Sequence, residues 1–311
     1  MIISASRRTD IPTFYSEWFL NRIKEGFLYV RNPMNEHQVS KITLSPEVVD
    51  CIVFWTKNPI PMIPRLDELG AYPYYFQFTL TGYGKDVESC LPDKKTALIP
   101  AFQTLAQKLG PDRVIWRYDP IAFNQRYTEA YHLQAFEQIA KALRGCTNKC
   151  VISFVDSYHK NRKSLESMEF RDGSDSDLLK FVRKLSRIAG ENNMTLATCA
   201  EKMDLSSAGV EHNACIDKGV IEKILGCRIN AKKDASQRPE CQCVASVEVG
   251  TYNSCGNGCR YCYANFSPET VKKHMAQYDP DSPILCDHIR EGDKITERPM
   301  KSIADRQLSL L

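Results

Sequence analysis

The sequence of 311 residues lacks long apolar runs and strong net charge. No run approaches the roughly 20 residues of a membrane-spanning helix. The first residues also lack the layout of a signal peptide, because Arg7 and Arg8 follow the apolar stretch instead of preceding it. The net charge of +3 is too small to indicate a nucleic-acid or membrane-surface partner. These absences predict a cytoplasmic protein with no membrane association.

Cysteine, by contrast, is abundant and unevenly placed. The chain has 13 cysteines, and nine of them lie between Cys199 and Cys286. In a reducing compartment clustered cysteines indicate metal ligands before disulfides. Hydrophobic residues at 43% and charged residues at 25% are typical of a soluble globular protein. The length suits one large α/β domain, with room for a small appended module.

The most informative cysteines form one tight loop. Cys255, Cys259 and Cys262 follow the spacing Cys-x3-Cys-x2-Cys, with Gly256 and Gly258 between the first two. Three thiolates can hold three irons of a [4Fe–4S] cluster, and the two glycines let the backbone bring the sulfurs together. The fourth iron would then be open to a substrate or cofactor, as in catalytic metal sites. A zinc knuckle with His274 as fourth ligand is the alternative.

With Tyr261 directly before the last cysteine, this loop resembles that of the radical S-adenosylmethionine (SAM) enzymes. The resemblance implies that SAM binds the open iron and is cleaved to a 5′-deoxyadenosyl radical. The run Tyr-Cys-Tyr-Ala at 261–264 is most similar to the spore photoproduct lyase branch. Over nearly its whole length, the chain resembles the uncharacterised domain-of-unknown-function family 1848. That resemblance implies a class of cofactor and leaves the substrate open.

Short apolar runs alternate with amphipathic helical stretches, which predicts a parallel α/β fold. We expect seven strands, at Ile2–Ala5, Cys51–Thr56, Tyr74–Leu80, Arg113–Arg117, Cys150–Val155, Thr195–Cys199 and Val244–Val249. Helices are expected at Tyr15–Glu25, Ala97–Leu109, Thr128–Leu143 and Asp177–Ile188, and a hairpin between Phe27 and Leu44. Nearly every expected strand ends in polar residues. This favours a TIM-like (β/α) partial or closed barrel with one shared active-site mouth.

The cysteine loop follows an expected strand and precedes an expected helix at Ser267-Pro-Glu. Radical SAM enzymes have this order at the start of their barrel, whereas here it stands near the C-terminus. We therefore expect a circularly permuted barrel, in which Val244–Val249 lies next to Ile2–Ala5. Residues 1–200 would supply the barrel units, and residues 201–311 a cysteine-rich iron–sulfur region that completes the barrel. No Gly-Gly-Glu run follows the loop, so the SAM contacts of the superfamily cannot be carried over.

A second metal site is expected upstream of the loop. Cys241 and Cys243 flank a single residue, and burying two such thiolates is costly unless a metal neutralises them. Cys215 would join them, with Cys199 or Cys227 as the fourth ligand. Such a site suits zinc or a second iron–sulfur cluster. For Cys199, inside an apolar run, an ordinary core position is an equal alternative.

Cationic side chains at the expected strand ends are candidates for cofactor or substrate binding. Arg7 and Arg8 could bind a carboxylate or phosphate, and Lys57 and Arg117 occupy similar positions. For Lys57 and Arg117, an internal ion pair is an equally open alternative to substrate binding, and Asp119 is the candidate partner of Arg117.

Beside these cations stand aromatic residues that could enclose a planar molecule or serve as packing: Trp55, Tyr75, Tyr83, Trp116, Tyr118 and Tyr158. We expect a small polar or anionic substrate and a reductant such as a ferredoxin or flavodoxin. Two alternatives stay open. One is a non-catalytic electron-transfer or sensor protein with Cys241 or Cys243 as fourth cluster ligand. The other is a DNA photoproduct lyase-like repair enzyme, which the scattered basic residues do not favour.

Overall fold

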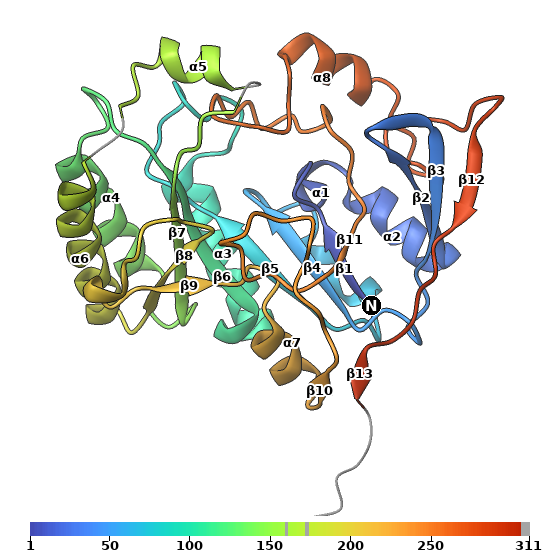
Figure 1. Cartoon of the computed structure of the whole chain (residues 1–311), viewed down its shortest axis with the longest axis horizontal. Helices are drawn as coiled ribbons and strands as arrows, with labels where there is room; N and C mark the ends of the chain where they lie inside the picture. The colour runs from blue at the N-terminus through green and yellow to red at the C-terminus, as the bar shows by residue number, and fades with distance from the viewer. Residues whose placement is uncertain (159–160, 172–173, 306–311) are drawn as a thin grey trace, which may run out of the picture.

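The computed structural model describes residues 1–158, 161–171 and 174–305. Its main body is an eight-stranded parallel sheet in the order β11-β1-β4-β5-β6-β7-β8-β9 (Figure 1). The strands are β1 Ile2–Ala5, β4 Cys51–Thr56, β5 Tyr74–Thr79, β6 Val114–Ile121, β7 Lys149–Phe154, β8 Thr195–Cys199, β9 Glu211–Asn213 and β11 Val247–Glu248. The protein is thus an α/β protein built on one large parallel sheet.

All seven expected strands are present, and most of their bounds agree within a few residues. The expected neighbours are also confirmed, because β11 pairs with β1 in parallel, Val247 opposite Ile3 and Glu248 opposite Ser4. The last expected strand is shorter than predicted and keeps only Val247–Glu248. Strand β9 was not predicted, since three polar residues carry no hydrophobic alternation.

The two faces of the sheet are buried against different layers. Alternate residues such as Ile3, Phe54 and Trp116 pack under the outer helices. Their sequence neighbours, such as Ile2 and Val53, face the other side and pack against the segments that follow β8. Both faces are therefore covered, which explains why the strands read as nearly continuous apolar runs.

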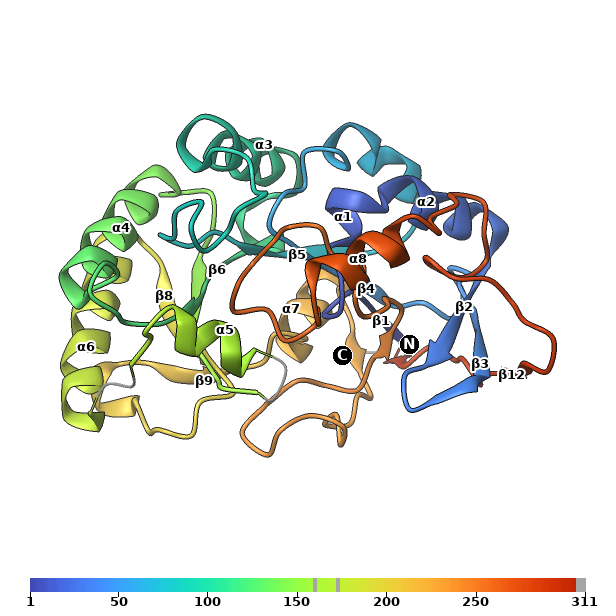
Figure 2. The same ribbon diagram turned by 90° about the horizontal axis from the view of Figure 1, so that it is seen from above.

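Several of the helices lie around the outer side of the sheet (Figure 2). The helices are α1 Ile11–Phe14, α2 Ser16–Glu25, α3 Ile99–Leu109, α4 Glu129–Ala142, α5 Arg162–Ser167, α6 Asp175–Glu191, α7 Lys218–Leu225 and α8 Pro268–Met275. The four predicted long helices are present as α2, α3, α4 and α6. Side-chain caps fix several starts: Thr128 accepts from the Tyr131 amide, and Ser267 from the Thr270 amide. No helix in the described ranges is long and apolar enough to cross a membrane.

Two smaller β elements sit beside the main sheet. The predicted hairpin is confirmed as β2 Phe27–Asn32 and β3 Asn35–Thr43, and β12 Lys294–Glu297 adds a third strand. A two-stranded ribbon joins β10 Arg228–Ile229 to β13 Ala304–Asp305. In Figure 1 this ribbon and α7 lie at one end of the molecule, opposite α5 and α8. The segments after β8 thus supply both edge strands of the main sheet, β9 and β11, and cover its inner face.

Candidate functional site

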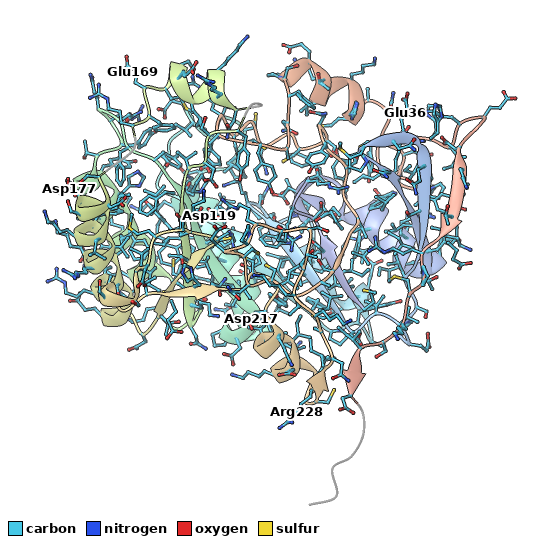
Figure 3. All side chains as sticks on the ribbon, in the orientation of Figure 1. Glu36, Asp119, Glu169, Asp177, Asp217 and Arg228 are labelled. Carbon is cyan, nitrogen blue, oxygen red and sulfur yellow. The ribbon has the colours of Figure 1, made fainter. Side chains whose placement is uncertain are left out.

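The carboxyl ends of the strands open into one cavity of about 460 Å³. Residues at or just after the ends of β1, β4, β5, β6, β7 and β8 all contribute to its wall, as the polar strand ends predicted. Asp119, at the end of β6, lies well inside the molecule, whereas Glu36 and Asp177 lie at its periphery (Figure 3). The cavity is therefore a shared interior site that several strands build together.

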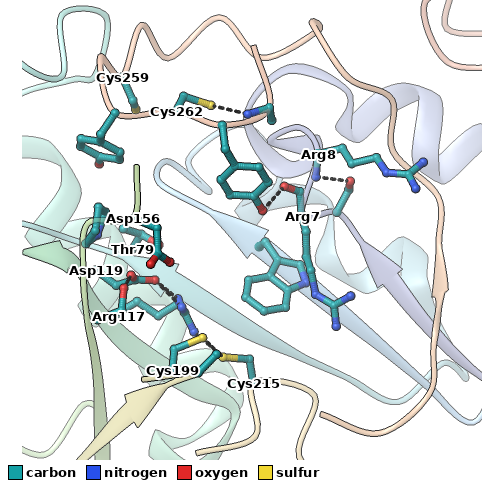
Figure 4. A pocket seen from close by; sticks show the side chains of 18 of the residues that line it. Arg7, Arg8, Thr79, Arg117, Asp119, Asp156, Cys199, Cys215, Cys259 and Cys262 are labelled. Carbon is teal, nitrogen blue, oxygen red and sulfur yellow. Dashed lines mark hydrogen bonds and ion pairs between the residues drawn. The ribbon is translucent and has the colours of Figure 1, made fainter. Parts of the chain in front are cut away.

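Both cysteine groups line this cavity. Figure 4 shows Cys259 and Cys262 on one side and Cys199 and Cys215 on the opposite side, with Arg117 and Asp119 between them. Both groups come from the segments between the end of β8 and α8, and they line one cavity because these segments meet at the strand ends.

The three thiols of the cysteine loop are close enough to influence one another. Burial raises the pKa of Cys255 well above its usual value and that of Cys259 to about 12, and the neighbouring cysteine sulfurs add to both shifts. Without a metal these two side chains are therefore neutral thiols. The Ala264 amide donates to Cys262 Sγ at 3.3 Å. Three sulfurs on one loop facing a cavity form a donor set suited to a metal with one open position.

Buried polar contacts hold the cysteine loop against the sheet. Asn257 donates to the Asp10 carboxylate at 2.9 Å, and Asp10 also accepts from the Thr13 and Lys57 amides at 3.1 Å and 2.8 Å. Asp10 therefore caps α1 and anchors the loop as well. On the other side of the loop, Asn161 donates to the Tyr261 carbonyl at 3.1 Å.

Glu88 forms a second anchor, which the sequence did not reveal. Its carboxylate, 1% exposed, accepts from Lys57 Nζ at 2.8 Å, from Lys94 Nζ at 2.5 Å and from the Tyr261 hydroxyl. Burial alone would raise the pKa of Glu88, but the two ammonium groups outweigh it and hold the pKa at about 2. Because Glu88 lies in a loop with no periodic pattern, no sequence signal could have identified it.

The second cysteine group lies in one buried cluster beneath the sheet, which contains Cys215, Cys241 and Cys243 with Cys199 packed against it. Cys199 and Cys215 lie 3.3 Å apart at Sγ, and the Ile216 amide donates to Cys243 Sγ at 3.3 Å. All four side chains line the cavity. Cys227 is not part of it, because it sits between α7 and β10, away from the cavity wall.

The four cationic candidates all line the cavity, but they differ in their partners. Lys57 is paired with Glu88, and Arg117 is paired with Asp119 and donates to Cys215 Sγ at 2.7 Å. Arg8 packs over the Tyr252 ring at 5.0 Å.

Arg7 differs from the other three cations in the hydrogen bonding of its guanidinium group. Its guanidinium packs over the Trp55 ring at 5.4 Å, and the carboxylate that pairs with this guanidinium, Asp234, is 4.0 Å away. Its Nη2 atom is buried and has no hydrogen-bond partner among the described residues. Arg7 is therefore the cation best placed to bind an anion in the cavity.

Of the six aromatic residues considered from sequence, only Trp55 and Tyr158 line the cavity. The other four are buried packing residues, Tyr75, Tyr83, Trp116 and Tyr118, each no more than 2% exposed. Tyr261 and Tyr263 line the cavity instead.

Glu248 is a second site residue that the sequence analysis did not identify. It accepts from the hydroxyls of Ser4 and Ser6 and from the Arg7 amide, and so fixes the backbone at the cavity edge. A charged residue between Val247 and Val249 in a buried strand was the signal that could have indicated it.

Within the described ranges, no group of three or more histidine, cysteine, aspartate or glutamate side chains is arranged to hold a metal ion as it stands. Metal binding by either cysteine group would require the thiols to lose protons and turn toward a common point.

A parallel α/β protein with a cysteine-lined cavity at its strand ends is the class that these features define. The family model described as Domain of unknown function (DUF1848) matches residues 2–264, and the chain belongs to that family. The matched range includes both cysteine groups. No match was found among curated proteins or among solved structures.

Proposed function

We propose that this protein is a radical SAM enzyme whose [4Fe–4S] cluster is held by Cys255, Cys259 and Cys262. The observation that carries the proposal is that all three thiols sit on one anchored loop and face a cavity built by strand ends. An electron carrier or sensor would be expected to close its cluster with a fourth thiolate. The candidates that the sequence suggested for that ligand, Cys241 and Cys243, are packed in the cluster that contains Cys215.

The fold proposal that accompanies this function is a partial TIM-like barrel that is circularly permuted. The order β11, cysteine loop, α8 is the strand–cluster–helix order of the superfamily, displaced to the C-terminal part of the chain. Strand β1 lies beside β11, and β4 to β9 are then added in chain order on the same side. A sheet that grows in one direction favours a barrel-like winding over a doubly wound sheet.

The residues around the loop would hold it in place before a cluster binds. Asp10 and Glu88 fix the loop from two sides through Asn257 and Tyr261. When bound, the cluster would supply an electron for reductive cleavage of SAM to methionine and a 5′-deoxyadenosyl group. A ferredoxin or flavodoxin would serve as reductant, and the reducing cytoplasm suits such thiol chemistry.

The substrate that best suits the cavity is a small polar or anionic molecule. A volume of about 460 Å³ lies within the range of small-molecule sites. The buried Nη2 atom of Arg7 has no hydrogen-bond partner in the part of the chain that the structure describes, and a carboxylate or phosphate oxygen would supply one. Trp55 packs against Arg7 and offers an apolar surface for the rest of the molecule.

The test is anaerobic purification and reconstitution, followed by incubation of dithionite-reduced protein with SAM. We expect brown protein with about four irons at this site and the formation of 5′-deoxyadenosine. The triple variant C255A/C259A/C262A should lose that iron and the product. Cys90→Ala is the matched control, since Cys90 is exposed and its amide donates to the loop at Asn257, yet it does not line the cavity.

A colourless protein that holds one zinc at these cysteines would refute the cluster. An intact cluster that forms no 5′-deoxyadenosine, and whose EPR spectrum does not respond to SAM, would instead favour an electron-transfer or sensor protein.

A further inference from the structure

We propose that Cys199, Cys215, Cys241 and Cys243 form a second, closed metal centre with four thiolate ligands. This centre goes beyond the proposed function and stands whether or not the cysteine loop binds a cluster. Three separate segments supply its ligands: the end of β8, the residue pair after β9 and the strand-free stretch before β11.

Packing brings all four side chains into one group. Cys215 touches Cys199 at 3.3 Å between the sulfurs, and Cys215, Cys241 and Cys243 belong to one buried cluster against which Cys199 packs. Cys215, Cys241 and Cys243 are at most 6% exposed. Four thiols packed in one cluster can turn toward one ion once their protons are lost, and a set of four cysteines is the common ligand set of structural zinc and of iron–sulfur clusters.

Hydrogen-bond donors point at these sulfurs. Arg117 Nη1 lies 2.7 Å from Cys215 Sγ, and the Ile216 amide donates to Cys243 Sγ at 3.3 Å. Asn213 Nδ2 approaches Cys215 Sγ at 3.7 Å. A neutral thiol is a weak acceptor, so this arrangement suits sulfurs that carry negative charge.

The charge around the group has the sign that a thiolate centre needs. Four thiolates with a divalent ion keep a net negative charge, and so does a [4Fe–4S] cluster with four cysteines. The guanidinium group of Arg117 lies against Cys215 and would offset that charge, and Arg7 interacts electrostatically with Cys215 and Cys243. A purely apolar packing role for the cysteines would leave the buried contact between Arg117 and Cys215 without a reason.

A closed site also fits the fold. Residues 236–243 form a segment without helix or strand, and Ser236, Gln237 and Arg238 of this segment line the cavity wall. A metal shared by this segment, β8 and the residues after β9 would fasten the segment in place. All four metal positions would be filled by protein, so the centre would be structural and would not bind substrate.

The experiment uses the full chain carrying C255A/C259A/C262A, so that the cysteine loop contributes no metal. After anaerobic purification, elemental analysis should find either one zinc or about four irons per chain, and either result supports the centre. Adding C241S/C243S should remove that metal. Cys227→Ser is the matched control and should retain it, whereas Cys199→Ser should not.

The proposal would be overturned if the triple variant contained no metal but was folded, as judged by an unchanged circular dichroism spectrum. Metal content that survives C241S/C243S would also overturn it. If the protein with C241S/C243S added does not fold, the test is to add Co²⁺ to the metal-stripped triple variant and to record its absorption spectrum. Intense thiolate-to-cobalt absorption is expected, and its absence would overturn the centre.

Discussion

Tyr261 and Glu88, 173 positions apart in the chain, are joined by a hydrogen bond from the phenol to a fully buried carboxylate. The same phenol accepts from Lys57 Nζ at 2.7 Å. The aromatic residue before the last cysteine of the loop is thus the point at which the loop is fastened to the loops that follow β4 and β5. Its hydroxyl, more than its ring, makes this connection.

Removal of that hydroxyl should therefore loosen the loop. We expect Tyr261→Phe to lower the free energy of unfolding by about 1–3 kcal/mol, because it leaves a buried carboxylate and a buried ammonium each short of a partner. Urea unfolding followed by circular dichroism measures this. Tyr158→Phe is the matched control, since the Tyr158 side chain is exposed and its hydroxyl is 3.3 Å from Asp156. It should change stability by less than about 0.5 kcal/mol. Equal effects of the two variants would contradict this assignment.

Glu88→Gln tests the ionic part of the same anchor. The variant removes the negative charge that compensates two buried ammonium groups, those of Lys57 and Lys94. We expect a loss of about 3–5 kcal/mol in unfolding free energy, as is typical when one partner of a buried ion pair is removed. Glu137→Gln breaks an exposed pair with Lys141 and should cost at most about 0.5 kcal/mol. A loss below 1 kcal/mol for Glu88→Gln would show that the pairs contribute little.

The turn between the first two cysteines should not tolerate a side chain. Gly258 has φ +68°, and a Cβ there would come within 2.3 Å of Ser89 Oγ and 3.1 Å of Cys90 Sγ. Gly258→Ala should therefore shift the loop and reduce the iron retained after reconstitution. Gly145→Ala is the control that tests backbone strain without a steric clash. Gly145 has φ +78°, and no described atom lies within 4 Å of the added Cβ. This variant should cost about 1–2 kcal/mol of stability and leave iron content unchanged. Iron loss in Gly145→Ala alone would be inconsistent with this explanation.

Stability should fall in mild acid because of His132. Its buried ring donates from Nε2 to the Ala122 carbonyl at 3.1 Å and accepts at Nδ1 from the Tyr118 hydroxyl at 2.9 Å. Burial lowers the pKa of His132 from 6.5 to about 4, so the unfolded chain takes up the proton first as pH falls. The stability from this residue is complete above about pH 6.5 and declines toward pH 4, by up to about 3 kcal/mol.

The pH test compares unfolding free energies at pH 7 and pH 4.5 for the wild type and His132→Gln. The variant should show a smaller decrease between the two pH values. His288→Gln, at a side chain that is 72% exposed, should keep the wild-type pH dependence. An unchanged decrease in His132→Gln would assign the acid sensitivity to other groups.

Local patterns predicted most of the secondary structure. The bounds of β1, β4 and β8 agree with the expected strands, because compact apolar runs between polar residues have few other solutions. Thr128 and Ser267 were recognisable helix starts, since a side-chain oxygen beside a helical pattern caps the exposed amides. The pairing of β11 with β1 was also predictable, but only from the resemblance.

The sequence by itself determined the α/β class, the parallel order of the strands and the cysteine loop, because these depend on hydrophobic periodicity and on residues that are close in the chain. Only the tertiary structure decided that Cys199 joins the second sulfur group and Cys227 does not. It also decided that Glu88 anchors Tyr261 and that Arg7 Nη2 has no partner among the residues described here. These relationships depend on side chains that are brought together by the convergence of strand ends, and distance along the chain carries no information about that convergence.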